Sequence, residues 1–108
     1  MNVAGQSDEP PRLRAEAEQA LLDFIRTDLD VCLTLAGLAE TKYRLGNREH
    51  ADETLTRAEK GYSDMLRFFS RARGVTAEVE KELQSKFKQL RARLDGLKRF
   101  DGETAGEG

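Results

Sequence analysis

The stretch KYRLGNREHADETLTRAEKGY, residues Lys42–Tyr62, decides how this chain folds. A helix-type pattern precedes Gly46, and helices commonly end at a glycine in the left-handed conformation. Asn47 follows, and asparagine is a favoured residue for capping the start of a new helix. Beyond it, Ala51 and Ala58 stand seven residues apart on one face of the predicted helix. The stretch therefore predicts an elbow between two closely packed helices.

The segment before the elbow is expected to form one long helix over residues 12–45. Two neighbouring rows of positions run along it in steps of three and four, which gives a wide apolar face suited to two neighbouring helices. The first row is Ala17, Leu21, Phe24, Asp28, Val31, Leu35 and Leu38. The second row is Leu22, Ile25, Leu29, Cys32, Ala36, Ala39 and Tyr43. Thr27 with Asp30 is a weak capping pattern that leaves a break as the alternative, but both rows pass it without a phase shift.

Two further helices are expected after the elbow, over residues 48–73 and 77–99. The second helix carries a heptad-type stripe, namely Ala51, Leu55, Ala58, Tyr62, Met65, Phe69 and Ala72. Gly74 is expected to end this helix, and Thr76 is expected to cap the third. The third helix repeats apolar residues at Val79, Leu83, Phe87, Leu90, Leu94 and Leu97.

These elements predict an all-α fold of three long antiparallel helices in an up-down-up bundle, because short connections force neighbouring helices to run antiparallel. Residues 11–100 are the expected bundle domain. Residues 1–10 are small and polar and are expected to be a flexible N-terminal arm. Residues 101–108, with the sequence DGETAGEG, have the composition of a disordered acidic tail.

The segment from Cys32 to about Met65 resembles a single tetratricopeptide (TPR) repeat, a helix–turn–helix unit of 34 residues. The matching positions are the large Leu35 and Leu38, the small Ala39, the turn Gly46–Asn47, and the small–large–small set Ala51, Leu55 and Ala58. Lys42 replaces the usual aromatic residue, Ser63 replaces the usual proline, and no second copy follows. The resemblance implies a peptide-binding face made by Leu33, Ala36, Glu40 and Tyr43. A close-packed helical hairpin outside that family is the alternative interpretation.

Composition excludes several classes of protein. The net charge is −2, whereas a nucleic-acid binder usually carries a basic surplus. The single cysteine, Cys32, cannot form an internal disulfide and stands among apolar neighbours, so we expect it to be buried. The sequence contains neither a run of transmembrane length nor a signal-peptide pattern. We therefore expect a cytoplasmic protein, of bacterial origin, that does not associate with membranes.

The residues offer little for catalysis. His50 is the only histidine, and the sequence HADETL that begins with it lacks the lysine and glycine that follow the phosphoacceptor of histidine phosphotransfer domains. Metal sites need clustered cysteine, histidine or carboxylate ligands, and Cys32 and His50 lie on different predicted helices. No glycine-rich phosphate loop occurs. We expect neither enzymatic activity nor a cofactor nor a metal site.

The function expected from the sequence is that of a non-catalytic helical protein–protein interaction module, a small scaffold or adaptor. Its partner is expected to be another protein or a second copy of the chain in a homodimer, because three thin helices cannot cover every apolar position. The expected partner-binding residues are Leu21, Leu22, Ile25 and Leu29, together with the TPR-type face Leu33, Ala36, Glu40 and Tyr43. The alternative is a nucleic-acid-associated or regulatory accessory protein that uses the basic third helix, with Lys86, Lys88, Arg91, Arg93, Lys98 and Arg99.

Overall fold

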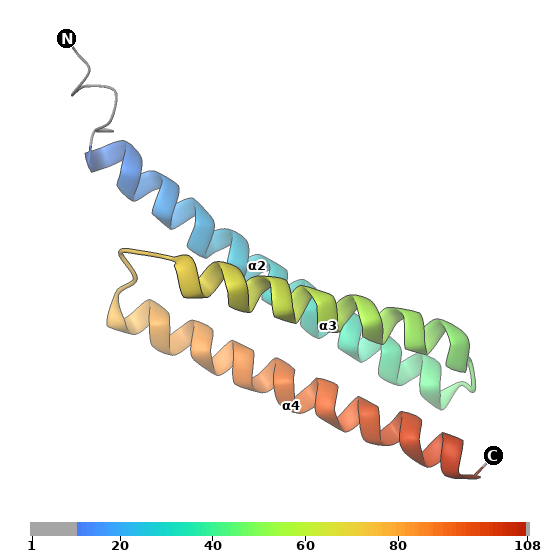
Figure 1. Ribbon diagram of the computed structural model, residues 1–108. Coiled ribbons are helices and arrows are strands. Elements are labelled where there is room, and N and C mark those ends of the chain that lie inside the picture. Colours follow the sequence, from blue (N-terminus) through green and yellow to red (C-terminus); the bar gives the residue numbers. More distant parts are fainter. Residues whose placement is uncertain (1–10, 108) are drawn as a thin grey trace.

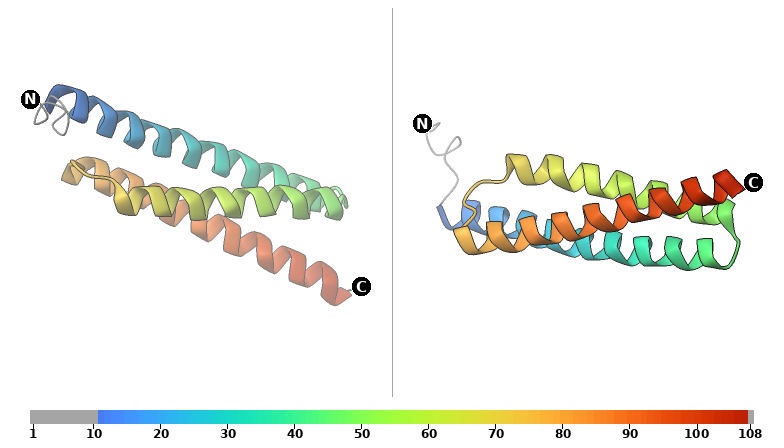
Figure 2. Two further views of the ribbon diagram at one scale, coloured as in Figure 1. Left: turned by 45° about the horizontal axis from the view of Figure 1, so that its top comes forward. Right: turned by 90° about the horizontal axis from the view of Figure 1, so that it is seen from below.

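The computed structural model describes residues 11–107, which form three α-helices and confirm the predicted all-α class. Helix α2 spans Pro11–Arg44, α3 spans Arg48–Arg71 and α4 spans Ala77–Glu107. The three run up, down and up as a thin bundle that measures 70 × 26 × 17 Å (Figure 1). Helix α4 is inclined to the other two (Figure 2).

Helix α2 is continuous, so the predicted single helix is confirmed and there is no break at Thr27. The second predicted row is buried along its whole length and faces the other two helices. We call this set the buried row, and its members are Leu22, Ile25, Leu29, Cys32, Ala36, Ala39 and Tyr43. One row at steps of three and four contacts the core over six turns, and this regular contact favours a continuous helix.

The elbow closes as predicted around Gly46, whose φ of 81° lies in the left-handed region. The Gly46 N–H donates to the Tyr43 carbonyl (3.0 Å), and the Asn47 N–H donates to the Lys42 carbonyl (2.9 Å). This pair of bonds is the Schellman arrangement, which satisfies carbonyl groups at the end of a helix. Leu45 N–H still donates to Thr41 (3.0 Å), so the chain remains helical up to the glycine.

The prediction that the Asn47 side chain caps α3 is wrong. Asn47 stands at the N-cap position of α3, but its side chain makes no capping hydrogen bond. Its φ of −92° and ψ of 69° lie outside the extended conformation that a capping side chain needs. The reason is that the Asn47 backbone already closes α2. Its carbonyl oxygen still accepts the Ala51 N–H (3.0 Å), which starts the hydrogen bonding of α3.

The second connection differs slightly from the prediction at its start. Helix α3 ends at Arg71 rather than residue 73, because Ala72 is extended with φ −68° and ψ 145°. Gly74 has a φ of 68°, and a side chain there would overlap the Glu18 carboxylate of α2. Thr76 caps α4 as predicted, since its Oγ1 accepts the Val79 N–H (3.2 Å).

Helix α4 continues to Glu107, so its predicted end at residue 99 is too early. The sequence DGETAGE, read as part of a disordered tail over 101–108, is helical over residues 101–107. Its two glycines each weaken a helix by only about 1 kcal/mol, and no proline follows to stop the helix. The expected arm, residues 1–10, and Gly108 lie outside the described residues.

The core lies between the three helices and depends on small residues where α2 and α3 cross. Ala36 and Ala39 of α2 and Ala51 and Ala58 of α3 are fully buried. A β-carbon added at Gly61 would overlap the Cys32 Sγ, so the α3 backbone approaches this α2 side chain closely here. Because these residues are small, α3 packs close to α2.

Helix α4 covers the remaining side of the core through one aromatic cluster. The Phe87 ring lies 5.9 Å from that of Tyr62, edge to face, and 5.5 Å from that of Phe69. On both sides of Phe87 along α4 the stripe is buried, at Leu83, Leu90, Leu94 and Leu97. The third helix is thus part of the fold and closes it.

Candidate interaction surface

The structure places most of the predicted partner-binding residues inside the chain's own core. Leu22, Ile25, Leu29, Ala36 and Tyr43 are buried against α3 and α4, so they cannot form an exposed patch. This corrects the expectation that three helices leave them uncovered. The close approach permitted by the alanines and by Gly61 is the physical reason, because it brings apolar side chains of both neighbours onto this one row.

The other predicted residues lie at the border of the core. Leu21 and Leu33 are half-buried and pack against it. Glu40 is also half-buried, and it joins two arginines: Arg93 of α4 at 2.9 Å and Arg44 of its own helix at 2.6 Å. The TPR-type face is therefore occupied by α4 within the same chain.

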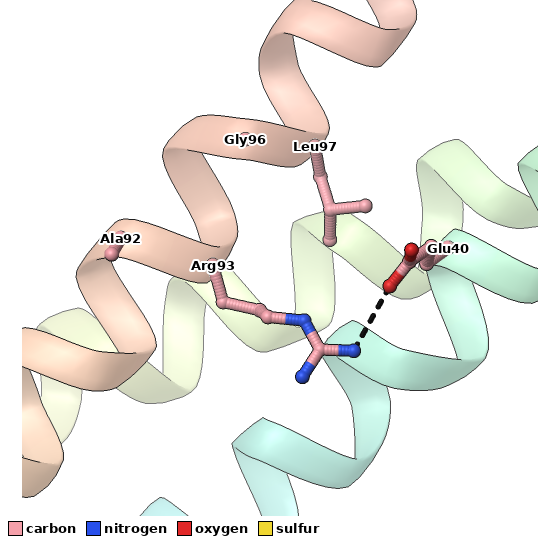
Figure 3. A pocket seen from close by; sticks show the side chains of 5 residues that line it. All are labelled: Glu40, Ala92, Arg93, Gly96 and Leu97. Carbon is pink, nitrogen blue, oxygen red and sulfur yellow. Dashed lines mark hydrogen bonds and ion pairs between the residues drawn. The ribbon is translucent and has the colours of Figure 1, made fainter.

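A small hollow at this border shows the same closure. It has a volume of about 250 Å³ and is lined by Glu40 of α2 and by Ala92, Arg93, Gly96 and Leu97 of α4. Figure 3 shows the Arg93 side chain reaching across it to the Glu40 carboxylate. The Arg93 guanidinium and the Glu40 carboxylate form an ion pair, so the hollow is bridged by a contact between α2 and α4.

The basic residues of α4 are largely engaged within the chain. Lys86 pairs with Asp30 of α2 (2.7 Å). On the α3 side, Lys98 lies 3.1 Å and Arg91 3.8 Å from the Glu59 carboxylate. That carboxylate oxygen is shielded from water and has no partner of good hydrogen-bond geometry, so the two cations neutralise it by charge alone. Acidic side chains of α2 and α3 thus pair with basic side chains of α4 inside one chain.

An uncovered row runs along the outer side of α2. It steps by three and four, one to two positions away from the buried row. Its members are Leu13, Ala17, Ala20, Phe24, Thr27, Val31, Thr34, Leu38, Thr41 and Leu45, and every one is exposed. We call it the exposed row. The large side chains are strongly exposed: Leu13 49%, Phe24 50%, Val31 47%, Leu38 46% and Leu45 78%.

The exposed row has the pattern of a coiled-coil seam. Its steps alternate between three and four without interruption, which is the 3.5-residue period that keeps one helix face against a partner helix. No member of the row is charged, although 35% of the chain's residues are. A solvated helix face in such a chain would carry charged residues, so this composition requires a reason beyond solubility.

Two of the three threonines of the row bond their hydroxyl groups to the backbone of their own helix. Thr34 Oγ1 donates to the Asp30 carbonyl (3.1 Å), and Thr41 Oγ1 donates to the Gly37 carbonyl (3.2 Å). Both hydroxyl groups are satisfied by their own helix. The row can therefore be covered by another helix without leaving these donors unpaired.

Helix α3 extends the row sideways at one end. The ring of Phe68, which is 37% exposed, meets that of Phe24 edge to face at 6.1 Å. The two rings join α2 and α3 into one apolar surface. Sequence reasoning missed this surface because the predicted first row included Leu21, Asp28 and Leu35, which are half-buried, and omitted the threonines. The absence of charge at every third and fourth position was the available signal.

Cys32 and His50 are the two other side chains that the sequence singled out for reactivity. Cys32 is buried as predicted, and its burial, followed by the negative charges of Asp28 and Asp64, raises the pKa of its thiol to about 11. The thiol therefore stays protonated and inert at neutral pH. His50 is exposed on the first turn of α3. Within residues 11–107, no three histidine, cysteine or carboxylate side chains are grouped to hold a metal ion.

The part of the chain that the structure describes includes no helix with the length and apolar character to cross a membrane. Comparisons with protein-family models, with curated proteins and with solved structures found no match for this chain.

Proposed function

We propose that this chain is a non-catalytic protein–protein interaction module whose binding surface is the exposed row of α2. The observation that carries the proposal is the row itself: an uninterrupted, uncharged seam on a helix whose opposite side already holds the core. Exposed apolar surface of this extent on a small protein usually marks an interaction site. The alternating spacing specifies a helix as the binding element.

Two earlier alternatives have less support. A nucleic-acid-binding role for α4 would use six cations, of which Lys86, Arg91, Arg93 and Lys98 pair with carboxylates of the chain, while Lys88 and Arg99 are exposed. Kinship with the TPR family stays a prediction that no observation here tests. A cytoplasmic location is part of the proposal and is supported by the lone buried thiol of Cys32.

The proposal is tested by capture of binding proteins with a variant that blocks the row. Val31→Glu places a charge in the middle of the seam, and Thr56→Glu places the same charge on an exposed position of α3. Tagged wild-type and variant chains are compared under identical conditions, with circular dichroism as the check that both variants fold. We expect bound protein, including untagged copies of the chain, to be lost from Val31→Glu and retained by Thr56→Glu. Equal capture by all three chains would contradict the proposal.

A further inference from the structure

The spacing and the length of the exposed row indicate what kind of helix can cover it. A 3.5-residue period requires a partner helix that follows the same left-handed supercoil for the same distance. From Leu13 to Leu45 this distance is roughly 48 Å at 1.5 Å per residue. A second α2 supplies a helix of the required period and length, with the same uncharged seam.

The sizes of the side chains select an antiparallel pair. In the antiparallel register that uses the whole row, each bulky residue near the centre meets a small or β-branched one. Phe24 faces the partner's Thr34, Leu38 faces the partner's Ala20, and Val31 faces the partner's Thr27. Large and small side chains that alternate across a seam interdigitate without voids.

A parallel pair in register lacks this fit. It would place Phe24 against its own copy and Ala20 against its own copy, so that crowded layers alternate with empty ones. Side-chain size therefore disfavours the parallel arrangement.

The flanks of the antiparallel register carry one complementary pair, which two-fold symmetry repeats. Glu16 of one chain lies beside the partner's Arg44, whose exposed side chain also pairs with Glu40 of its own helix at 2.6 Å. These pairs lie near the two ends of the seam, where they fix the register without being buried. A shift by one heptad would separate them.

One of the like charges that the register brings together is compensated within each chain. Asp30 would meet its own copy, but Lys86 already neutralises it at 2.7 Å. Asp28 lies on the α3 side of the seam and is half-buried beside Gly61. Lys42 would approach the partner's Arg14; its Nζ donates to Thr54 Oγ1 at 2.9 Å, and this neutral partner leaves the like charges at this flank uncompensated.

We propose that the exposed row binds the exposed row of a second copy of this chain, with the two α2 helices antiparallel. The proposal rests on the proposed function, because it names the partner of the same surface. The resulting two-fold dimer has a core of α2 and α3 from each chain, and the paired rings of Phe24 and Phe68 complete it on each side of the axis.

Sedimentation equilibrium of the purified full chain at micromolar concentrations tests self-association. We expect twice the chain mass of 12.1 kDa for the wild type. Val31→Glu should weaken association on the order of 100-fold, because it buries an unpaired charge in the seam. Thr56→Glu should leave the mass of the dimer unchanged. A monomeric mass for the wild type at every concentration would overturn the proposal.

Disulfide trapping tests the orientation. Chains with Ala20→Cys and chains with Leu38→Cys are mixed and oxidised with glutathione disulfide, while the buried Cys32 stays inert. We expect a mixed disulfide between the two kinds of chain, since these positions face each other in the antiparallel register. Disulfides that join only like chains would overturn that orientation in favour of a parallel pair.

These tests separate the inference from the function on which it rests. If the wild type is monomeric but Val31→Glu alone loses a different captured protein, the interaction module stands and self-pairing falls. If the wild type dimerises and Val31→Glu dimerises equally well, the exposed row is not the interface and both proposals fail.

Discussion

Helix α2 carries two rows with the same spacing, of which one is buried and the other is exposed. Every member of the buried row is buried in the core, whereas every member of the exposed row is exposed, and Phe24 of that row contacts Phe68 of α3. Both rows step by three and four, and both avoid charge. The difference shows that spacing identifies faces that bind helices, while the small residues of the partner helices decide which face the chain itself covers.

The largest expected effect is a difference in stability between substitutions in the two rows. Leu29→Ala in the buried row should destabilise the chain by about 2–5 kcal/mol, because Leu29 is fully buried and a cavity would remain. Val31→Ala in the exposed row should change the stability of the dilute, unassociated chain by no more than about 0.5 kcal/mol. Urea unfolding at submicromolar concentration measures both. Equal losses would mean that the two rows are not different in the single chain.

A second substitution sharpens the reason why one row is covered. Gly61→Ala should cost about 1–3 kcal/mol, because the added methyl group overlaps Cys32 Sγ at the α2–α3 crossing. Combined with Cys32→Ala, which removes the sulfur atom, the same change should cost clearly less. Thermal unfolding of the two single variants and the double variant gives this coupling. Strictly additive losses would show that the two residues do not limit the approach.

The elbow determines which side of α2 receives α3, and Gly46 tests it. Gly46→Val should cost about 1–2 kcal/mol, because a side chain resists the φ of 81°. No neighbouring atom lies within 4 Å of the added β-carbon, so the loss is conformational rather than steric crowding. Gly96→Ala is the matched control, since Gly96 is helical and equally open, and it should stabilise α4 by up to about 1 kcal/mol. A stable Gly46→Val variant would place the turn elsewhere.

The smallest expected effect concerns the ion pairs that hold α4 beside α2. Hydrogen bonds from Arg26 hold the pKa of the Glu82 carboxyl below its ordinary value. A carboxyl with a lowered native pKa stabilises the fold above its ordinary pKa, and this contribution is lost as the pH falls through the native value. Glu82→Gln should therefore flatten the decline of stability with acid, compared with Glu78→Gln. Identical acid unfolding curves for the two variants would remove this role for Arg26.

Much of the fold follows from local rules that act within short segments. The single helix through Thr27, the left-handed Gly46, and the cap at Thr76 were predictable, because each depends on a few neighbouring residues. The cap at Asn47 was wrong, since the same backbone also had to close α2. The end of α4 was wrong because two glycines without a proline do not stop a helix.

The candidate surface was harder to predict for a physical reason. Leu22, Ile25 and Leu29 were expected to face a partner, and Phe24 and Val31 were expected to be the neighbouring row of the core. A sequence pattern cannot rank two rows of equal spacing, because burial depends on how closely the other helices approach. That approach depends on Gly61, which was not part of any predicted stripe.

Thiol labelling reports whether a second copy of the chain covers the exposed row. Thr34→Cys places a probe in the row, Thr56→Cys places the same probe on an exposed position of α3, and the native Cys32 is inert because of its burial and raised pKa. If a second copy binds the row, labelling at position 34 slows as the chain concentration rises into the micromolar range, while labelling at position 56 does not change. If labelling at position 34 stays as fast as at position 56 over the whole range, the row is not covered and the antiparallel dimer is wrong.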